Sequence, residues 1–302
     1  MKASGRSRPS RLLPLRLGTR GSALALAQAR WVAERLDDHV ELVEISAQGA
    51  VGDKSRFVKA IEEALLAGTV DLAVHSAKDV PGELPTGLSV VGVPERADPY
   101  DALCGATSLD ELPPGAVVGT ASLRRRAQLL ALREDLEIRE LRGNVDTRLK
   151  RLGDYDAIVL AQAGLDRLGR GGEGKLLEAL VPAPGQGCLA LEARGEDKAT
   201  AAAAARLTDR AALTALTAER ALVTALDASC NTPIGAHARQ SGGALRLSAF
   251  VGLPDGSHWI RDEMDGDGAE PAALGMAVAQ RLEAAGAREL LDEAERAAVD
   301  VR

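Results

Sequence analysis

The sequence predicts an α/β protein in which two sheet-containing modules are followed by a smaller α+β unit. Short apolar runs alternate with helical patterns over the first half of the 302-residue chain. This alternation is typical of a largely parallel sheet covered by helices. The last third instead carries a long helix, a strand hairpin and a final helix. A chain of this length has room for roughly two domains, or three small ones.

The first module is predicted from strands at 15–17, 40–45, 72–74 and 88–93 and from helices at 23–36 and 57–67. Ser22 offers an N-cap for the first helix, and Gly68 ends the second. The segment 95–99 (Glu-Arg-Ala-Asp-Pro) breaks this pattern, and we expect a hinge there.

The second module is predicted from strands at 117–119, 136–141 and 157–161, with a helix at 123–132 capped by Ser122 and another around 147–152. The segment 181–187 (Val-Pro-Ala-Pro-Gly-Gln-Gly) indicates a second linker. Beyond it we expect a helix at 207–226, strands at 245–251 and 258–264 joined by the turn at 254–256, and a helix at 273–285.

The composition excludes several classes of protein. Aromatic residues are 2% of the chain and its net charge is −7, so we expect neither base stacking on nucleic acid nor attraction to anionic membranes. No apolar run approaches the ~20 residues of a membrane span. The three cysteines and four histidines are scattered, which predicts no metal site and suits a reducing compartment. The basic first eleven residues lack the apolar stretch of a secretory signal, and we expect a disordered tail, with a weak import signal as the alternative.

The arginines fall where the predicted strands end. Arg20 follows the first strand, the run 124–126 opens the helix capped by Ser122, and Arg142 follows a later strand with Arg148 six residues beyond. Ligands of open α/β sheets bind past the carboxyl ends of the strands, and arginine pairs well with carboxylates. Cations in a helix's first turn oppose its dipole, which a bound anion would offset. A solvated basic face or salt bridges to Glu would explain any single arginine, but the convergence favours an anion site.

Two further residues are candidates for chemistry. Asp79 directly follows the buried strand at 72–74 beside Lys78, where a carboxylate can act as an acid or base, although such an Asp is often a turn residue. Cys230 lies in a loop of small polar residues, where an accessible thiolate can form a covalent attachment. We interpret His75, Cys104 and Cys188 as structural.

Six motifs in a fixed order identify the family that the chain resembles. They are LGTRGS at 17–22, DLAVHSAKDVP at 71–81, VGTASLRR at 118–125, LRGNVDTR at 141–148, PGQG at 184–187 and CNTPIG at 230–235. Together they resemble porphobilinogen deaminase, and the likeness runs from about residue 16 to about residue 291.

The resemblance implies two doubly wound α/β domains similar to periplasmic binding proteins, plus a small α+β C-terminal domain. The expected ranges are 12–94 with 188–205, then 100–181, then 207–302, the last carrying the cofactor cysteine. It also implies a dipyrromethane cofactor joined to Cys230 by a thioether. Four units of porphobilinogen are added to it with loss of ammonia, before water frees hydroxymethylbilane. The protein would then be a monomeric, cytoplasmic transferase of tetrapyrrole biosynthesis, with porphobilinogen as its small-molecule partner and no nucleic acid, membrane or metal.

The resemblance also assigns roles to residues of this chain. Asp79 matches the catalytic acid, which would assist loss of ammonia and stabilise the cationic azafulvene. The other matched residues would bind the acetate and propionate groups of cofactor and substrate: Arg20, Ser22, Lys78, Thr120, Ser122, Arg124, Arg125, Arg142, Arg148 and Gln186. Arg126 has no clear counterpart in the family.

The loop after the second strand departs from the family pattern. At 48–57 it is shorter and has fewer glycines than the family's mobile lid, so we expect Phe57, with Lys54 or Arg56, to take over the lid contacts. Three alternatives stay open: an inactive homologue, a two-lobed anion-binding protein, and the effector domain of a transcription regulator. The last would need a DNA-binding helix-turn-helix, for which the first 15 residues leave no room.

Overall fold

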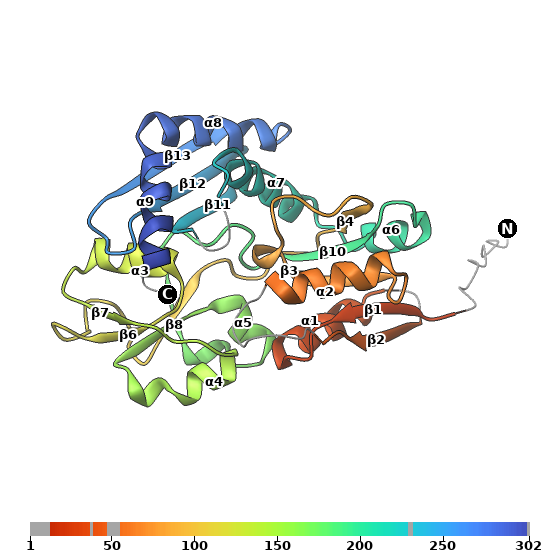
Figure 1. Cartoon of the computed structure of the whole chain (residues 1–302), viewed down its shortest axis with the longest axis horizontal. Helices are drawn as coiled ribbons and strands as arrows, with labels where there is room; N and C mark the ends of the chain where they lie inside the picture. The colour runs from red at the N-terminus through yellow and green to blue at the C-terminus, as the bar shows by residue number, and fades with distance from the viewer. Residues whose placement is uncertain (1–12, 37–38, 47–54, 229–231, 301–302) are drawn as a thin grey trace.

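The computed structural model describes residues 13–36, 39–46, 55–228 and 232–300. In this part of the chain two five-stranded sheets and one three-stranded sheet are each covered by helices (Figure 1). The chain passes from the first five-stranded sheet to the second, returns to the first, and then builds the three-stranded sheet.

The first sheet is doubly wound. Its strand order is β2-β1-β3-β10-β4. These strands are β1 (Leu15–Thr19), β2 (Val40–Glu44), β3 (Leu72–Ser76), β4 (Leu88–Gly92) and β10 (Leu189–Arg194). The helices are α1 (Ala23–Ala33), α2 (Ser55–Leu66) and α6 (Lys198–Ala205). Buried side chains of α1 and α6 pack on one face of the sheet, and those of α2 pack on the other.

The second sheet repeats this plan. Its strand order is β7-β6-β8-β5-β9. The strands are β5 (Asp101–Cys104), β6 (Val117–Gly119), β7 (Glu137–Arg139), β8 (Ala157–Ala161) and β9 (Lys175–Leu177). The helices are α3 (Leu123–Leu132), α4 (Val145–Lys150) and α5 (Gln162–Arg167). The α3 helix packs on one face, while α4 and α5 pack on the other.

Both sheets are largely parallel, as predicted, but each contains one antiparallel strand that the sequence did not reveal. The β10 strand runs antiparallel to β3 and β4, and β5 runs antiparallel to β8 and β9. Each of these strands follows a linker from the other domain. Each begins opposite the carboxyl end of a parallel strand, Leu189 opposite Ser76 and Asp101 opposite Ala161. A strand that enters its sheet from that end has to run against its neighbours.

The C-terminal part is the expected α+β unit. Its strands are β11 (Ile234–Ser241), β12 (Ala244–Gly252) and β13 (Trp259–Gly266), and its helices are α7 (Arg210–Ala225), α8 (Pro271–Ala284) and α9 (Ala287–Asp300). The predicted hairpin at 254–256 is confirmed, since β12 and β13 pair in antiparallel register on either side of it. All three helices contribute to one aliphatic core with the sheet, consistent with the scarcity of aromatic residues.

The two linkers cross each other in close contact. The amide of Ala97 donates to the carbonyl of Gly187 at 3.2 Å. Gly187 has a φ of +89°, and a Cβ on it would lie 2.3 Å from the Ala97 carbonyl oxygen. Only glycine fits this crossing, which fixes the path of the chain between the two α/β domains.

Candidate anion site where the two α/β domains meet

The site lies at the carboxyl ends of the parallel strands, where the two domains face each other. The 3₁₀ turn η1 (Ala77–Asp79) follows β3 directly and carries Lys78 and Asp79. The amide of Ala77 donates to the carbonyl of Cys188 at 3.0 Å, which anchors this turn to the start of β10. Asp79 is therefore held, half-buried, on a rigid strand end.

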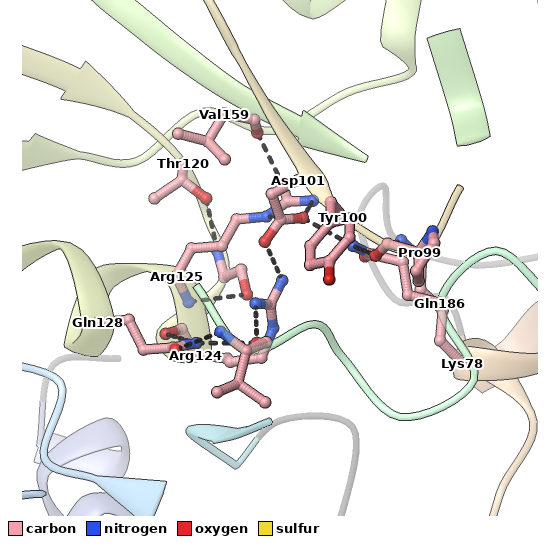
Figure 2. A network of polar contacts seen from close by, with 12 residues as sticks. Lys78, Pro99, Tyr100, Asp101, Thr120, Arg124, Arg125, Gln128, Val159 and Gln186 are labelled. Carbon is pink, nitrogen blue, oxygen red and sulfur yellow. Dashed lines mark hydrogen bonds and ion pairs between the residues drawn. The ribbon is translucent and has the colours of Figure 1, made fainter. Parts of the chain in front are cut away.

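The strongest polar contacts in this region converge on Asp101, the first residue of β5 (Figure 2). Its Oδ2 accepts from Arg124 Nη2 at 2.7 Å, and its Oδ1 accepts from Arg125 Nε and Nη2 at 3.1 and 2.8 Å. Burial alone would raise the pKa of the Asp101 carboxyl, but the two guanidinium groups hold it well below its usual range.

Arg124 and Arg125 are thus buried, at 4% and 5% exposure, and paired with a carboxylate of the protein itself. Arg124 Nη1 also donates to the Val181 carbonyl at 2.7 Å, and Arg125 Nη1 to the Val159 carbonyl at 2.8 Å. The anion that we expected to offset cations at this helix start is therefore in part Asp101. Direct binding of a ligand by the two arginines stays a prediction.

Gln186 connects this cluster to the first domain. Its Nε2 donates to the Pro99 carbonyl at 2.7 Å and to Asp101 Oδ1 at 2.8 Å. Its Oε1 accepts from Lys78 Nζ at 3.1 Å. Because Gln186 is 1% exposed, both ends of its amide are committed to these partners inside the protein.

The serines and the threonine shape the helix starts. Ser22 Oγ accepts from the amide of Ala25, and Ser122 Oγ accepts from the amide of Arg125, so each serine caps its helix as predicted. The hydroxyl of Thr120 accepts from the amide of Ser122 at 3.2 Å. These caps fix the turns from which Arg20 and the α3 arginines project.

Arg20 differs from the α3 arginines in its surroundings. Its guanidinium carbon lies 4.2 Å from the centre of the Phe57 ring, a cation–π contact. Its Nε is buried without a hydrogen-bond partner among the described residues. Phe57, one of the lid candidates, therefore contacts a predicted ligand-binding residue, while its role as a lid stays a prediction. Lys54 lies outside the described residues.

Arg148 and Arg142 occupy different environments. Burial lowers the pKa of Arg148 to about 10, with the positive charges of Arg125 and Arg142 adding to the effect and Asp79 opposing it. Charges from both domains therefore act on Arg148, which remains cationic at neutral pH. Arg142 is exposed and pairs with Glu140 at 2.6 Å, so in this structure its guanidinium is engaged at the surface.

The predicted attachment cysteine, Cys230, lies outside the described residues. The other two cysteines are buried and free. Burial raises the pKa of Cys104 to about 11 and that of Cys188 to about 12. Both thiols stay protonated at neutral pH and are poor nucleophiles, so neither competes with Cys230 as an attachment point.

Sequence reasoning missed two charged residues of this region. Asp101 opens a fully buried strand, and a charged residue in such a run signals a buried partner. Arg167 ends α5 directly after β8 and donates from Nη2 to the Gly187 carbonyl at 2.6 Å. It occupies the same post-strand position as the other arginines, so the same rule would have found it.

The side chains present fit a multiply carboxylated ligand such as a dipyrromethane. Cationic and hydroxyl donors gather from both domains, and the buried Nε atoms of Arg20 and Arg124 have no hydrogen-bond partner in the described part of the chain. Among the described residues no group of three or more His, Cys, Asp or Glu side chains is placed to hold a metal ion.

The fold and the site together define a two-lobed α/β protein with a cationic, carboxylate-binding junction. Residues 15–202 match the family model described as porphobilinogen deaminase, dipyromethane cofactor binding domain, and residues 213–284 match its C-terminal domain. The chain belongs to the porphobilinogen deaminase family. It therefore has the cofactor-binding domain and the function of that family, and the alternatives of an inactive homologue or a separate anion receptor find no support in these matches.

Two similar relatives, both named porphobilinogen deaminase, come from bacteria. The protein of Thiobacillus denitrificans is 45% identical over 299 residues, covering 92% of this chain and 98% of the relative. That of Thermus thermophilus is 47% identical over 292 residues, covering 91% and 97%.

Among solved structures, YhfZ from Shigella flexneri matches with a TM-score of 0.34 and 17% identity, covering 70% of this chain and 95% of that one. A substrate-binding protein of an amino acid ABC transporter matches with a TM-score of 0.33 and 15% identity, covering 65% and 91%. The fold class rests on the strand order of the two doubly wound sheets.

Proposed function

We propose that this family member is a hydroxymethylbilane synthase, a transferase that condenses four porphobilinogen units on a dipyrromethane held by Cys230. The observation that carries the proposal is the position of Asp79. It stands at the end of β3, and its charge acts on Arg148 of the facing domain. The Asp79 carboxylate is thereby set near cations that suit the acetate and propionate groups of a pyrrole.

Binding is the task of the cations. Arg20 and Lys78 approach from the first domain, and Arg124, Arg125 and Arg148 from the second. We propose that their remaining N–H groups, together with Ser22 and Ser122, hold the carboxylates of cofactor and substrate. Thr120 would support them from the turn before α3, and Gln186 from the second linker. Arg142 would exchange its surface partner Glu140 for a ligand carboxylate.

Proton transfer and charge stabilisation are the tasks of Asp79. When bound, the dipyrromethane would supply the nucleophilic pyrrole carbon for the first unit, and each added unit would supply the carbon for the next. Asp79 would assist departure of ammonia from the substrate's aminomethyl group and then stabilise the positive charge left on the substrate ring. A carboxylate suits this role because the charge that develops is positive.

We also propose that the protein acts as a monomer in the cytoplasm and does not bind nucleic acid or membranes. The family resemblance supports the monomer, and the net charge of −7 with 2% aromatic residues supports the absence of nucleic-acid binding. None of the helices in the described residues is long and apolar enough to cross a membrane.

The test of the proposed chemistry is Asp79→Asn. We expect the purified variant to carry the cofactor, since the cations that bind it are unchanged, and to lose nearly all release of ammonia from porphobilinogen. Intact mass measures the first and steady-state turnover the second. Near-normal turnover would reject the role of Asp79.

A further inference from the structure

Asp101 is a buried carboxylate of the site, and both of its oxygens are engaged. It is 0% exposed, and its two oxygens accept hydrogen bonds from three side chains, those of Arg124, Arg125 and Gln186. Figure 2 shows all three pointing toward it, with Lys78 beyond Gln186.

Each arginine is held at two points, and Asp101 is one of them in both cases. Arg124 is fixed between Asp101 and the carbonyl of Val181 in the second linker. Arg125 is fixed between Asp101 and the carbonyl of Val159 in β8. Loss of the carboxylate would leave each guanidinium with a single anchor and free to turn.

The same carboxylate also reaches the first domain. Gln186 donates to Asp101 at 2.8 Å and accepts from Lys78 Nζ at 3.1 Å. The ammonium next to Asp79 is therefore tied, through one buried amide, to the arginines of the second domain. Asp101 contributes one negative charge against the two guanidinium groups of Arg124 and Arg125, so this pair keeps a surplus of positive charge for an incoming anion.

Donor capacity remains on both arginines after these contacts. A guanidinium has five N–H groups; the contacts above use two of Arg124 and three of Arg125. The buried Nε of Arg124 has no partner among the described residues. The arrangement thus holds the side chains in place without using up the groups that recognise a carboxylate.

We propose that Asp101 is a positioning residue for ligand carboxylates: it orders Arg124 and Arg125, and through Gln186 also Lys78, before cofactor and substrate arrive. This inference rests on the proposed function. Asp101 does not touch the reacting atoms, so its loss should weaken binding far more than it slows the chemistry.

The test compares Asp101→Asn with Asp71→Asn. Asp71 is a matched control because it also pairs with two arginines, Arg16 at 2.8 Å and Arg194 at 3.3 Å, but it precedes β3 and lies at the opposite end of the strand from η1. The readouts are cofactor occupancy by intact mass and, on the loaded fraction, KM for porphobilinogen and kcat.

For Asp101→Asn we expect occupancy below half and a KM raised about tenfold or more, with kcat within about threefold of the wild type. For Asp71→Asn we expect full occupancy and a KM within about twofold. An Asp101→Asn protein with wild-type occupancy and KM overturns the inference. So does an Asp71→Asn protein that reproduces the Asp101→Asn defects, because the effect would then be general loosening.

If Asp101→Asn does not fold, Gln186→Met keeps the proposal testable. This change leaves both ion pairs intact and removes the hydrogen bonds that join Lys78, Pro99 and Asp101 through the Gln186 amide. We expect KM to rise about threefold to fivefold, and an unchanged KM refutes the link. A wild-type protein that shows neither adduct nor turnover refutes the proposed function itself, which separates the two failures.

Discussion

Glu219 of α7 holds the two linkers and the C-terminal unit together. It is 0% exposed. Its carboxylate accepts from Arg96 of the first linker at 2.6 Å, from the amide of Gly185 in the second linker at 2.6 Å, and from the amide of Ala238 in β11 at 2.8 Å. Segments far apart in the sequence therefore share one buried anion.

Glu219→Gln should destabilise the protein by about 3–5 kcal/mol, because it leaves the largely buried Arg96 without a counter-charge. The variant keeps the side-chain volume, so the cost comes from electrostatics and hydrogen bonding rather than from a cavity. With an m-value of about 3 kcal/mol/M, the urea midpoint should fall by about 1–2 M.

The assay is equilibrium urea unfolding followed by circular dichroism. The matched control is Asp265→Asn, which removes one of the two carboxylates that pair with Arg246 at the surface between β12 and β13. Its midpoint should be unchanged because surface pairs contribute little. A loss of less than about 1 kcal/mol in Glu219→Gln would refute the account of this junction.

Two further predictions concern pH and backbone geometry. Burial, with Arg96 and Arg239 adding, lowers the pKa of His237 to about 3 from 6.5. Below pH 6.5 His237 takes up a proton in the unfolded chain but not in the folded chain. The free energy of unfolding therefore falls as the pH falls, by about 2 kcal/mol at pH 5. Between pH 7 and pH 5 the free energy of unfolding of His237→Gln, measured with urea, should fall by about 2 kcal/mol less than that of the wild type. Equal losses in the two proteins would contradict the lowered pKa of His237. Gly187→Ala should lower the free energy of unfolding at least twice as much as Gly242→Ala, because Gly242 has a φ of +58° but open space around it. Equal shifts of the urea midpoint would rule out the close linker contact.

Local signals were sufficient for much of the fold. Ser22 and Ser122 cap the helices that they were expected to cap, because an N-cap is a contact within four residues. The turn at 254–256 likewise joins the two strands that flank it. By contrast, the direction of β5 and β10 depends on which end of a sheet the chain re-enters, and no pattern within a short strand encodes that.

The sequence likewise predicted some features of the site and not others. The rule that ligands lie past strand ends placed Lys78, Asp79 and the α3 arginines at one junction. It did not reveal that Arg124 and Arg125 of α3 pair with Asp101, because that partner lies more than twenty residues earlier, on β5. The side-chain directions of Arg142 and Arg148 depend on their contacts in the folded protein, which cannot be predicted from their spacing in the sequence.

The central claim is a cationic junction serving a dipyrromethane that is covalently held by Cys230. Intact-mass measurement with peptide mapping, on the purified wild type and on Cys230→Ser after incubation with porphobilinogen, tests it most directly. We predict an added mass of two pyrrole units on the peptide that contains Cys230, and no adduct on the variant. A wild-type protein with an unmodified thiol, or an adduct on any other residue, would contradict the account.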